Sequence, residues 1–549
     1  MDIAIIGMAG RFPKSRNTDE FWQHILNGDD CITRGDGAHD VNAYGSMEQI
    51  YAFDRKRYHI SEADALRMEP QERLMLQCVE QALFRAGLAS ANSNKVIGLI
   101  CGEPENEYDL LNRFYGEKKT EIESQNEHFQ YSGGAMAGRI AYLLNLKGPA
   151  IKIDTACSTS LSSVILAADM IENGYADVMV AGGSNVSLRQ EGYIHIPGMS
   201  SADGYVRPFD QNSSGMVPAN GVGAVVLKRY NEAVRDGNRI YAVIKGGFIT
   251  NDGSDKIGYT APSVDGESRA LRGALQRAGI RPDEVDYIET HGTATTLGDA
   301  IELRALKQVF PRDPAHPLYI GSLKANFGHM NAAAGISSVI KGCLMLHHEV
   351  IPPLIHHRDM NAEVSAQDGI CAPHEMRKQH LQYVGISSFG LGGMNAHMIL
   401  SYVQPQTEKV TNPQLTFDET EYITECVKRC LSGTPEDNSV QATPAQNHIH
   451  SQEEIASRIL AILAEQTGMD DIAPDDTFDE NGVVSMDQIV LSAKVSEEFS
   501  ASVSIEDLYQ YDTVTDLAAY IFRNQQQAEE EEQIEVEEYG DIDELFANL

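Results

Sequence analysis

Cys157 stands where a strand-like run ends and a helical pattern begins, in the segment IKIDTACSTSLSSVILAADM. Unpaired N–H groups and the dipole at a helix N-terminus favour a thiolate over a thiol. We therefore expect the helix start to depress the pKa of Cys157 relative to the other seven of the eight cysteines. A single cysteine is nevertheless more often a small core residue than a nucleophile, so this position alone does not identify a reaction.

Two histidines further along the chain change that interpretation. His291 lies in ETHGTATTLGDAIE and His329 in GSLKANFGHMNAAAG, each beside glycines and just after a strand-like run. One cysteine with two separated histidines in glycine-rich turns is typical of a nucleophilic acyl-transfer site.

The elements that must position these residues are strands and helices in alternation. Short apolar and β-branched runs such as DIAIIG, KVIGLICG and GAVVLK recur through residues 1–403, with helical stretches such as ESRALRGALQRAG between them. This alternation predicts an α/β fold with buried sheets. No internal repeat is visible in the sequence.

Composition excludes several classes of protein. The 549 residues allow three or four domains. A formal charge of −37, from 80 acidic and 43 basic residues, argues against nucleic acid or an anionic membrane as a partner. We expect a cytoplasmic protein with reduced thiols, since the cysteines form no CxxC pairs and there is neither a secretory leader nor an apolar run near the ~20 residues that span a bilayer. Cys426 and Cys430 lie one helical turn apart without a nearby histidine, so we expect no metal site.

The character of the chain changes after residue 403. Residues 404–450 are rich in Pro, Thr, Asn and Gln, as linkers are, with one short helix expected in DETEYITECVKRCL. This connector is too short for an acyltransferase domain, and no GxSxG nucleophile elbow occurs in the chain. The chain is therefore expected to be unable to load its own extender unit.

Residues 451–524 are expected to form a small domain of three to four helices. The first helix follows a polar cap and places Ile455, Ile459 and Leu463 on one face. Ser485 falls at the start of a second amphipathic helix, NGVVSMDQIVLSAKVSEEF. The remaining residues, 525–549, form an acidic tail in which Leu545, Phe546 and Leu549 suggest a segment that folds on binding a partner.

Eight motifs occur in order along residues 1–403 and together carry a resemblance to a known family. They are DIAIIGMAGRFPKS, MEPQERLMLQ, DTACSTS, VRPFDQNSSG, YTAPS, HGTAT, KANFGH and SSFGLGGMNAH. This part of the chain resembles the β-ketoacyl synthases, and more closely the ketosynthase domains of modular polyketide synthases. The resemblance implies the thiolase-like fold, an α/β/α/β/α sandwich of two similar halves, and a homodimer.

The resemblance also implies roles for site residues. Cys157 would accept the growing acyl chain as a thioester, with the backbone N–H groups of Cys157 and Leu391 as the oxyanion hole. His291 and His329 would stabilise an enolate as neutral imidazoles, and Lys324 would orient His329 and the acid network around it. Thr293 and Thr295 would hold the pantetheine arm.

Residues 451–524 resemble an acyl carrier protein, which implies 4′-phosphopantetheine on Ser485. The family usually has Asp-Ser-Leu at this point, whereas this chain has Val484-Ser485-Met486. The implied partners are acyl and malonyl carriers, a phosphopantetheinyl transferase, a separate trans-acting acyltransferase, and a downstream synthase subunit docked through the tail.

Several departures from the family pattern leave the exact reaction open. They are Ala294 for Gly in HGTGT, Leu391 for a gating Phe, Met394 for Thr, Asn220 for Glu in Gly-Glu-Gly, and Asn331 for Glu after the second histidine. Our leading hypothesis is decarboxylative condensation, because both histidines are retained. The alternatives are a non-elongating transacylase and a catalytically degenerate docking or dimer platform, against which the intact Cys157, His291, Lys324 and His329 argue.

Overall fold

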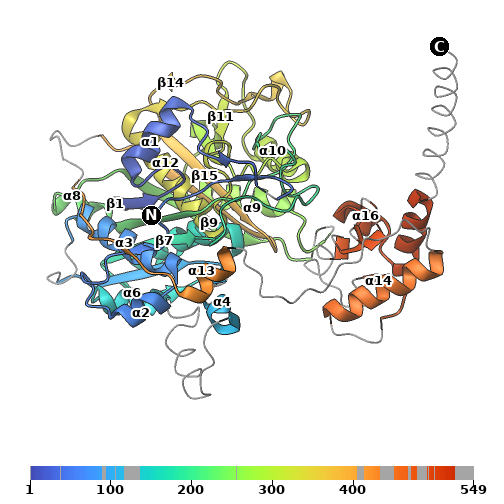
Figure 1. Cartoon of the computed structure of the whole chain (residues 1–549). Coiled ribbons are helices and arrows are strands. Elements are labelled where there is room, and N and C mark those ends of the chain that lie inside the picture. The colour runs from blue at the N-terminus through green and yellow to red at the C-terminus, as the bar shows by residue number, and fades with distance from the viewer. Residues whose placement is uncertain are drawn as a thin grey trace, which may run out of the picture. The chain divides into compact units, whose positions relative to one another are not determined.

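The computed structural model describes most of the chain. The described residues are 2–37, 39–88, 94–104, 107–115, 136–254, 256, 258–404, 413–432, 451–467, 472–478 and 491–525, the last range with gaps at 493, 497, 500 and 502. The chain divides near residue 436 into two compact units, which we describe separately (Figure 1).

A mixed sheet of eleven strands, counted within the described residues, forms the frame of the first unit. Its spatial order is β13-β11-β10-β15-β16-β9-β1-β8-β7-β5-β6. The strands are β1 (Ile3–Arg11), β5 (Ile97–Gly102), β6 (Ala150–Lys152), β7 (Val178–Asn185), β8 (Gly221–Arg229), β9 (Ala242–Asn251), β10 (Tyr287–Glu289), β11 (Leu318–Gly321), β13 (Ile370–Cys371), β15 (Tyr383–Gly390) and β16 (Met394–Ser401). Three two-stranded pairs add β2 (Thr33–Arg34), β3 (Ala43–Tyr44), β4 (Ala52–Phe53), β12 (Val350–Ile351), β14 (Arg377–Lys378) and β17 (Thr420–Glu421).

Helices connect these strands. The α-helices of the first unit are α1 (Thr18–Asn27), α2 (Glu62–Arg67), α3 (Pro70–Arg85), α4 (Glu107–Tyr115), α6 (Met136–Leu143), α7 (Thr159–Glu172), α8 (Tyr230–Arg235), α9 (Val264–Ala278), α10 (Thr296–Val309), α11 (Lys324–Phe327), α12 (Ala334–His348) and α13 (Glu425–Leu431). Short 3₁₀ turns are η2 (Ala156–Ser158), η3 (Pro282–Glu284), η4 (Asn331–Ala333) and η5 (Ala366–Asp368).

The two halves of the sheet repeat one topology. In the first half β5 lies parallel to both β6 and β7, β7 pairs antiparallel with β8, and β8 pairs antiparallel with β1. In the second half β10 lies parallel to both β11 and β15, β15 pairs antiparallel with β16, and β16 pairs antiparallel with β9. The halves meet where β1 runs antiparallel to β9. The structure thus contains a duplication that is not visible in the sequence.

Apolar clusters show how the layers are stacked. The largest cluster joins the central helices α7 and α12 to both halves of the sheet. A second cluster packs α3 and α6 on the outside of the first half, and a third packs α9 and α10 on the outside of the second half (Figure 1). The predicted thiolase-like α/β/α/β/α sandwich is confirmed.

Residues 413–432 lie on the first unit, although the sequence placed them in a linker; we call them the strap. β17 pairs with β4, and Arg73 Nη1 donates to the backbone oxygen of Tyr422 at 2.8 Å. The expected short helix is α13, whose Val427 is fully buried against Tyr108 of α4. The apolar side chains of Tyr422 and Val427 explain the difference, because they find buried contacts that a polar linker lacks.

The second unit is a small helical domain. Its helices include α14 (Gln452–Thr467), α16 (Ile505–Gln510) and helical residues within 491–499 and 514–525. Ile455, Ile459 and Leu463 are fully buried in its core, as their spacing predicts. Ser485, Leu545, Phe546 and Leu549 lie outside the described residues.

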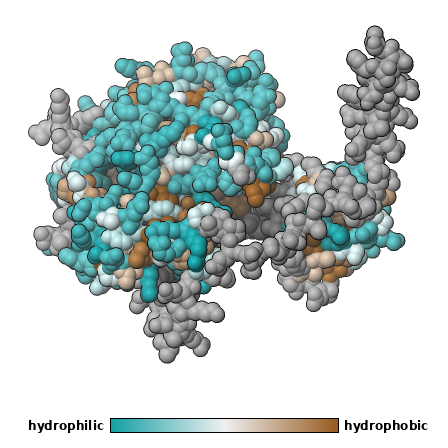
Figure 2. Space-filling view, viewed as in Figure 1, coloured by the Kyte–Doolittle hydropathy of each residue, from teal (hydrophilic) through white to brown (hydrophobic). Residues whose placement is uncertain are grey.

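The described surface is mostly hydrophilic on the face seen in Figure 2, with small apolar patches between the hydrophilic regions. Among the described residues no helix has both the length and the apolar character needed to cross a membrane.

Candidate active site

Equivalent turns of the two sheet halves carry the predicted catalytic residues. Cys157 lies in η2, between β6 and the central helix α7. Lys324 and His329 lie between β11 and the central helix α12, which is the same place in the second half. His291 follows β10 and precedes α10. The duplicated fold therefore brings together one cysteine and two histidines that are far apart in sequence.

The sulfur of Cys157 has hydrogen-bond partners on two sides. The thiol donates to Asn331 Oδ1, with a sulfur–oxygen distance of 3.7 Å. The backbone N–H groups of Leu391 and of Cys157 itself face the sulfur. Ser388 Oγ donates to the carbonyl oxygen of Cys157 at 2.9 Å, which fixes the turn. The two N–H groups are those expected for the oxyanion hole, which stays a prediction.

Burial raises the pKa of the Cys157 thiol above its ordinary value, so the expected depression is wrong. The charge of Lys324 and the N–H groups of Leu391 and Cys157 lower this pKa, but desolvation outweighs them. α7 begins only at Thr159, after a 3₁₀ turn, so the sulfur does not sit in the first α-helical turn. Burial has the same effect on a core cysteine outside the site, since it raises the pKa of Cys78 to about 11.

His329 is a neutral imidazole with its proton on Nε2. Its backbone is held by the segment just before β8, because its N–H donates to the carbonyl oxygen of Val217 at 2.7 Å and its carbonyl oxygen accepts from the N–H of Ala219 at 2.9 Å. Its Nδ1 accepts from the backbone N–H of Asn331 at 3.2 Å. Burial and the charge of Lys324 lower its pKa well below the ordinary value. Because Nδ1 is an acceptor, Nε2 carries the proton and can donate.

His291 faces His329 across the site. The two ring centroids are 5.6 Å apart with an angle of 82° between the rings, and Phe389 packs on His291 at 5.7 Å. Burial, followed by the charge of Lys324, lowers the pKa of His291 well below its ordinary value. Two neutral imidazoles that face each other can donate or accept hydrogen bonds without bringing a charge into the site.

Buried acids hold the loop that carries His291. Glu302 of α10 accepts from the backbone N–H groups of His291 and Gly292, both at 2.8 Å. Burial raises the pKa of Glu302 to about 7. Lys324 Nζ donates to the carbonyl oxygen of His291, so it positions His291 directly, whereas the resemblance had implied a role toward His329. Glu302 thus fixes the backbone of this loop from one side and Lys324 from the other.

Ala294 lies on the hidden side of the same loop. Its φ of +62° is in the left-handed region, and its side chain is fully buried in a cluster with Val206 and Val217. Its N–H donates to Asp299 Oδ1 at 3.0 Å. The methyl group is therefore buried beneath the loop, and its effect on a pantetheine arm stays a prediction.

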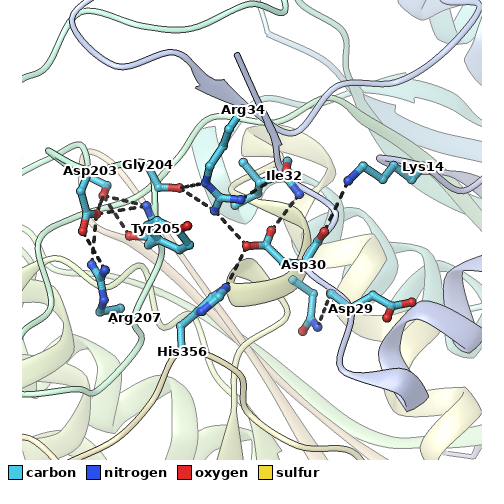
Figure 3. Close-up of polar contacts among 12 residues, drawn as sticks. Lys14, Asp29, Asp30, Ile32, Arg34, Asp203, Gly204, Tyr205, Arg207 and His356 are labelled. Atoms are coloured by element: carbon cyan, nitrogen blue, oxygen red, sulfur yellow. Dashed lines mark hydrogen bonds and ion pairs between the residues drawn. The ribbon is translucent and has the colours of Figure 1, made fainter. Parts of the chain in front are cut away.

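A polar network supports the neighbouring loops (Figure 3). Asp30 is 2.9 Å from the guanidinium of Arg34 and 2.9 Å from Nε2 of His356. The guanidinium of Arg34 stacks on the ring of Tyr205, 3.9 Å from its centroid. These contacts join residues 30–34 to the loops around Tyr205 and His356. Ile32 and Val206, which are sequence neighbours of these residues, belong to the buried cluster that includes Ala294.

The hydroxyls of Thr293 and Thr295 suit a pantetheine arm. They are 3.0 Å apart and half-buried, while Ala294 between them is buried. They lie over Gly298, where a Cβ atom would approach Thr295 Oγ1 to 2.4 Å. Two hydroxyls over a glycine can donate to and accept from the amides of such an arm, so these residues fit the group. Their role stays a prediction.

Among the other departures, Asn220 has a local explanation, and nothing in the structure explains Leu391 or Met394. Asn220 is fully buried, and its amide is satisfied by Tyr44, Ser187 and Gln190. Leu391 is 39 % exposed in a turn whose following glycines, Gly392 and Gly393, have φ of +88° and +91°. Within the described residues no cluster of three or more metal-ligating side chains exists, and Cys426 contacts Asn112 instead.

Sequence reasoning missed the acids and one amide that complete the site. Glu289 accepts from the backbone N–H of Leu323 at 2.6 Å and pairs with Lys341 at 2.5 Å. Asp299 and Glu302 are three residues apart on α10, a spacing that places both on one face and could have signalled them. Asn331 had been noted only as a departure.

Comparisons with known proteins agree with this geometry. Residues 1–233 match the family "Beta-ketoacyl synthase, N-terminal domain", residues 241–358 match its C-terminal domain, and residues 457–521 match "Phosphopantetheine attachment site". The last match identifies the second unit as a carrier domain for covalent 4′-phosphopantetheine.

Curated relatives are much longer than this chain. Polyketide synthase PksM of Bacillus subtilis (strain 168) is 36% identical over 455 residues, which are 75% of this chain and 10% of that protein. Polyketide synthase ThaG of Burkholderia thailandensis is 34% identical over 436 residues, 74% of this chain and 8% of that protein. The chain spans about a tenth of the length of these relatives.

Solved structures of ketosynthases cover the first unit. Ketosynthase twelve from the bacillaene polyketide synthase of Bacillus amyloliquefaciens is 32% identical with a TM-score of 0.69, covering 73% of each chain. The ketosynthase from module 6 of the bacillaene synthase of Bacillus subtilis 168 is 34% identical with a TM-score of 0.66, covering 74% of this chain and 72% of that one. Fold, site and comparisons agree, and the chain belongs to the β-ketoacyl synthase family, with a phosphopantetheine carrier domain that follows the ketosynthase in sequence.

Proposed function

We propose that this chain is a polyketide synthase subunit whose ketosynthase performs decarboxylative condensation. The observation that carries the proposal is the pair of neutral imidazoles beside Cys157, with Nε2 of His329 protonated because Nδ1 accepts from Asn331. Two N–H donors at one point are what a developing enolate oxygen needs.

The first half-reaction is transfer of an acyl group to Cys157. The sulfur attacks the carbonyl carbon of an acyl thioester donor, and the N–H groups of Cys157 and Leu391 stabilise the oxyanion. The donor's thiolate leaves and takes up the proton lost by the Cys157 thiol. Because the resting thiol is protonated, this proton transfer belongs to the reaction and does not precede it.

The second half-reaction begins with a malonyl thioester. Its carbon–carboxylate bond breaks, CO2 leaves, and the electron pair forms an enolate whose oxygen accepts from Nε2 of His291 and His329. The enolate carbon then attacks the Cys157 thioester, and the sulfur leaves as a thiolate. Neutral imidazoles suit this step, because they donate without fixing the carboxylate as an ion pair before CO2 departs.

The carrier unit supplies a thiol on its phosphopantetheine, on which acyl chains are held as thioesters. We propose Ser485 as the attachment residue, Thr293 and Thr295 as contacts for a pantetheine arm at the ketosynthase, and a separate acyltransferase as the source of malonyl groups. A transferase with coenzyme A should add one pantetheine to the wild type and none to Ser485→Ala, measured by intact-protein mass spectrometry.

Replacing His329 by alanine tests the condensing role. His329→Ala should lower CO2 release from malonyl-carrier by on the order of 10²-fold or more, while acylation of Cys157 stays largely intact. Cys157→Ala serves as the control that cannot be acylated. A wild-type chain that is acylated but releases no CO2 above background would instead establish a transacylase that passes acyl chains between carriers.

A further inference from the structure

The two turns that open the central helices face each other at the active site. η2 begins with Ala156 at φ +50°, and η4 begins with Asn331 at φ +43°. Both turns occupy the same position in the duplicated fold, before α7 and α12. Asparagine tolerates left-handed φ better than most residues, so the backbone alone offers one reason for Asn331.

The side-chain contact of Asn331 gives a second reason for an asparagine at this position. Asn331 is half-buried, whereas Ala332 and Ala333 behind it are 2 % and 0 % exposed. Its Oδ1 accepts from the Cys157 thiol at 3.7 Å, and its backbone N–H donates to His329 at 3.2 Å. One residue therefore touches both the nucleophile and the second histidine.

A carboxamide can serve either proton state of a thiol. Its oxygen accepts from S–H, and after a half-turn of the amide its NH2 donates to a thiolate. A carboxylate at the same place is an acceptor only, and it would repel a thiolate. We propose that Asn331 is a positioning residue whose amide turns over as Cys157 loses its proton, Oδ1 facing the thiol and Nδ2 facing the thiolate.

The other groups around the sulfur cannot change roles in this way. Lys324 favours the thiolate and Asp154 disfavours it, both through fixed charges. The N–H groups of Leu391 and Cys157 donate in either state. His291 and His329 stay uncharged, because burial lowers both pKa values. Asn331 is thus an uncharged side chain in contact with the sulfur. Its amide oxygen can accept from the thiol, and its NH2 group can donate to the thiolate.

The inference rests on the proposed role of Cys157 as the nucleophile, and it is tested without any carrier substrate. Asn331→Asp keeps the shape and tolerates the same φ, while Asn331→Gly keeps the backbone N–H and removes the side chain. Asn361→Asp is the control, since Asn361 lies outside the site and its Oδ1 caps the backbone N–H of Glu363. Alkylation of Cys157 by iodoacetamide is followed by peptide mass spectrometry from pH 6 to 10 for the full-length chain.

Asn331→Asp should slow alkylation about tenfold or more at pH values below the wild-type midpoint, which corresponds to a rise of about one unit or more in the pKa of Cys157. Asn331→Gly should be slowed less, about two- to fivefold, because it loses the donor without gaining a charge, and Asn361→Asp should match the wild type.

Three results would overturn the proposal. One is an Asn331→Asp profile that coincides with the wild type, and another is equal shifts in the Asp and Gly variants, which would mean a purely backbone role. The third is faster alkylation of Asn331→Gly, which would mean that the amide only holds the thiol. Failure of the proposed function would be seen in a different experiment, as a wild-type Cys157 that accepts no acyl group. The alkylation profiles do not depend on that result, because iodoacetamide needs no acyl donor.

Discussion

Burial sets the charge of the functional side chains in the first unit. It lowers the pKa of both active-site histidines and raises the pKa of Cys157. The resting site therefore holds a thiol and two imidazoles, all neutral, and not a thiolate–imidazolium pair. Such a site is activated by N–H donors that act as charge develops on the substrate, which suits both half-reactions of a condensation.

Ala294→Gly should change activity and stability little. Glycine would relieve about 1 kcal/mol of left-handed strain, lose about 0.8 kcal/mol from one buried methyl group, and cost about 0.5–1 kcal/mol in chain entropy. The net change in unfolding free energy should stay within about 1 kcal/mol. The KM for a pantetheine-linked acyl donor should stay within about twofold, because the methyl is buried beneath the loop. A severalfold fall in KM would show that the methyl does narrow the path.

His397 should make the first unit less stable in mild acid. It is fully buried, its Nδ1 is 2.9 Å from Ser387 Oγ, and burial lowers its pKa to about 3. The unfolded chain binds the proton near pH 6.5, so stability should fall as pH drops from about 6.5 towards 3, by about 2 kcal/mol at pH 5. Urea unfolding at pH 7 and pH 5 measures this loss.

Comparison with His397→Gln isolates this residue from the other titrating groups. The variant should lose about 2 kcal/mol less than the wild type between the two pH values, whatever its absolute stability. Exposed His316 provides the control, and His316→Gln should follow the wild type. Equal losses in wild type and His397→Gln would contradict the argument.

The sequence singled out Cys157, His291 and His329, because they stand in glycine-rich turns with recognisable neighbours, and their catalytic roles stay predictions. It did not predict the direction of the Cys157 pKa, since desolvation depends on which distant segments cover the sulfur. The partnership of Lys324 with His291 was hidden for the same reason, as 33 residues separate them.

At the scale of elements, duplication explains how the site is assembled. α7 and α12 are equivalent central helices, and the turns before them carry Cys157 on one side and His329 with Asn331 on the other. The alternation of strands and helices predicted the fold class, but the repeat was invisible because the two halves share topology and no obvious residue pattern. The strap was missed because its polar composition outweighs two buried side chains, Tyr422 and Val427.

Val427→Ala should loosen the strap. The side chain is fully buried against Tyr108, and losing its methyl groups should lower the free energy that holds the strap by about 1.5 kcal/mol. That loss corresponds to about tenfold faster cleavage within 413–432 by a dilute protease, if cleavage requires local opening. Lys428→Ala on the same helix is the control, since the Lys428 side chain is 50% exposed and pairs with Glu425 at the surface. Equal cleavage of the two variants would show that the strap is not held by this contact.

At the scale of the whole molecule, the chain joins a catalytic unit to a carrier unit with its own apolar core. Residues beyond the carrier helices are strongly acidic and end in the apolar positions Leu545, Phe546 and Leu549. A partner that held this tail would keep the carrier at a high effective concentration near the partner's active site. The tail would then raise the rate of transfer between subunits without touching the chemistry at Cys157.

Truncation after Gly540 should therefore leave acylation of Cys157 unchanged and slow acyl transfer to a downstream subunit at low micromolar concentration. The acidic residues call for a groove with an apolar floor and a basic rim, so the effect should weaken as salt rises. Leu545→Ala with Phe546→Ala should reproduce the truncation, because it removes the apolar anchors and keeps every charge. Transfer is measured by mass spectrometry of the downstream carrier after mixing. If truncated and full-length chains transfer at the same rate, the tail serves solubility alone; if only the truncation is slow, the charges and not the apolar anchors bind the partner.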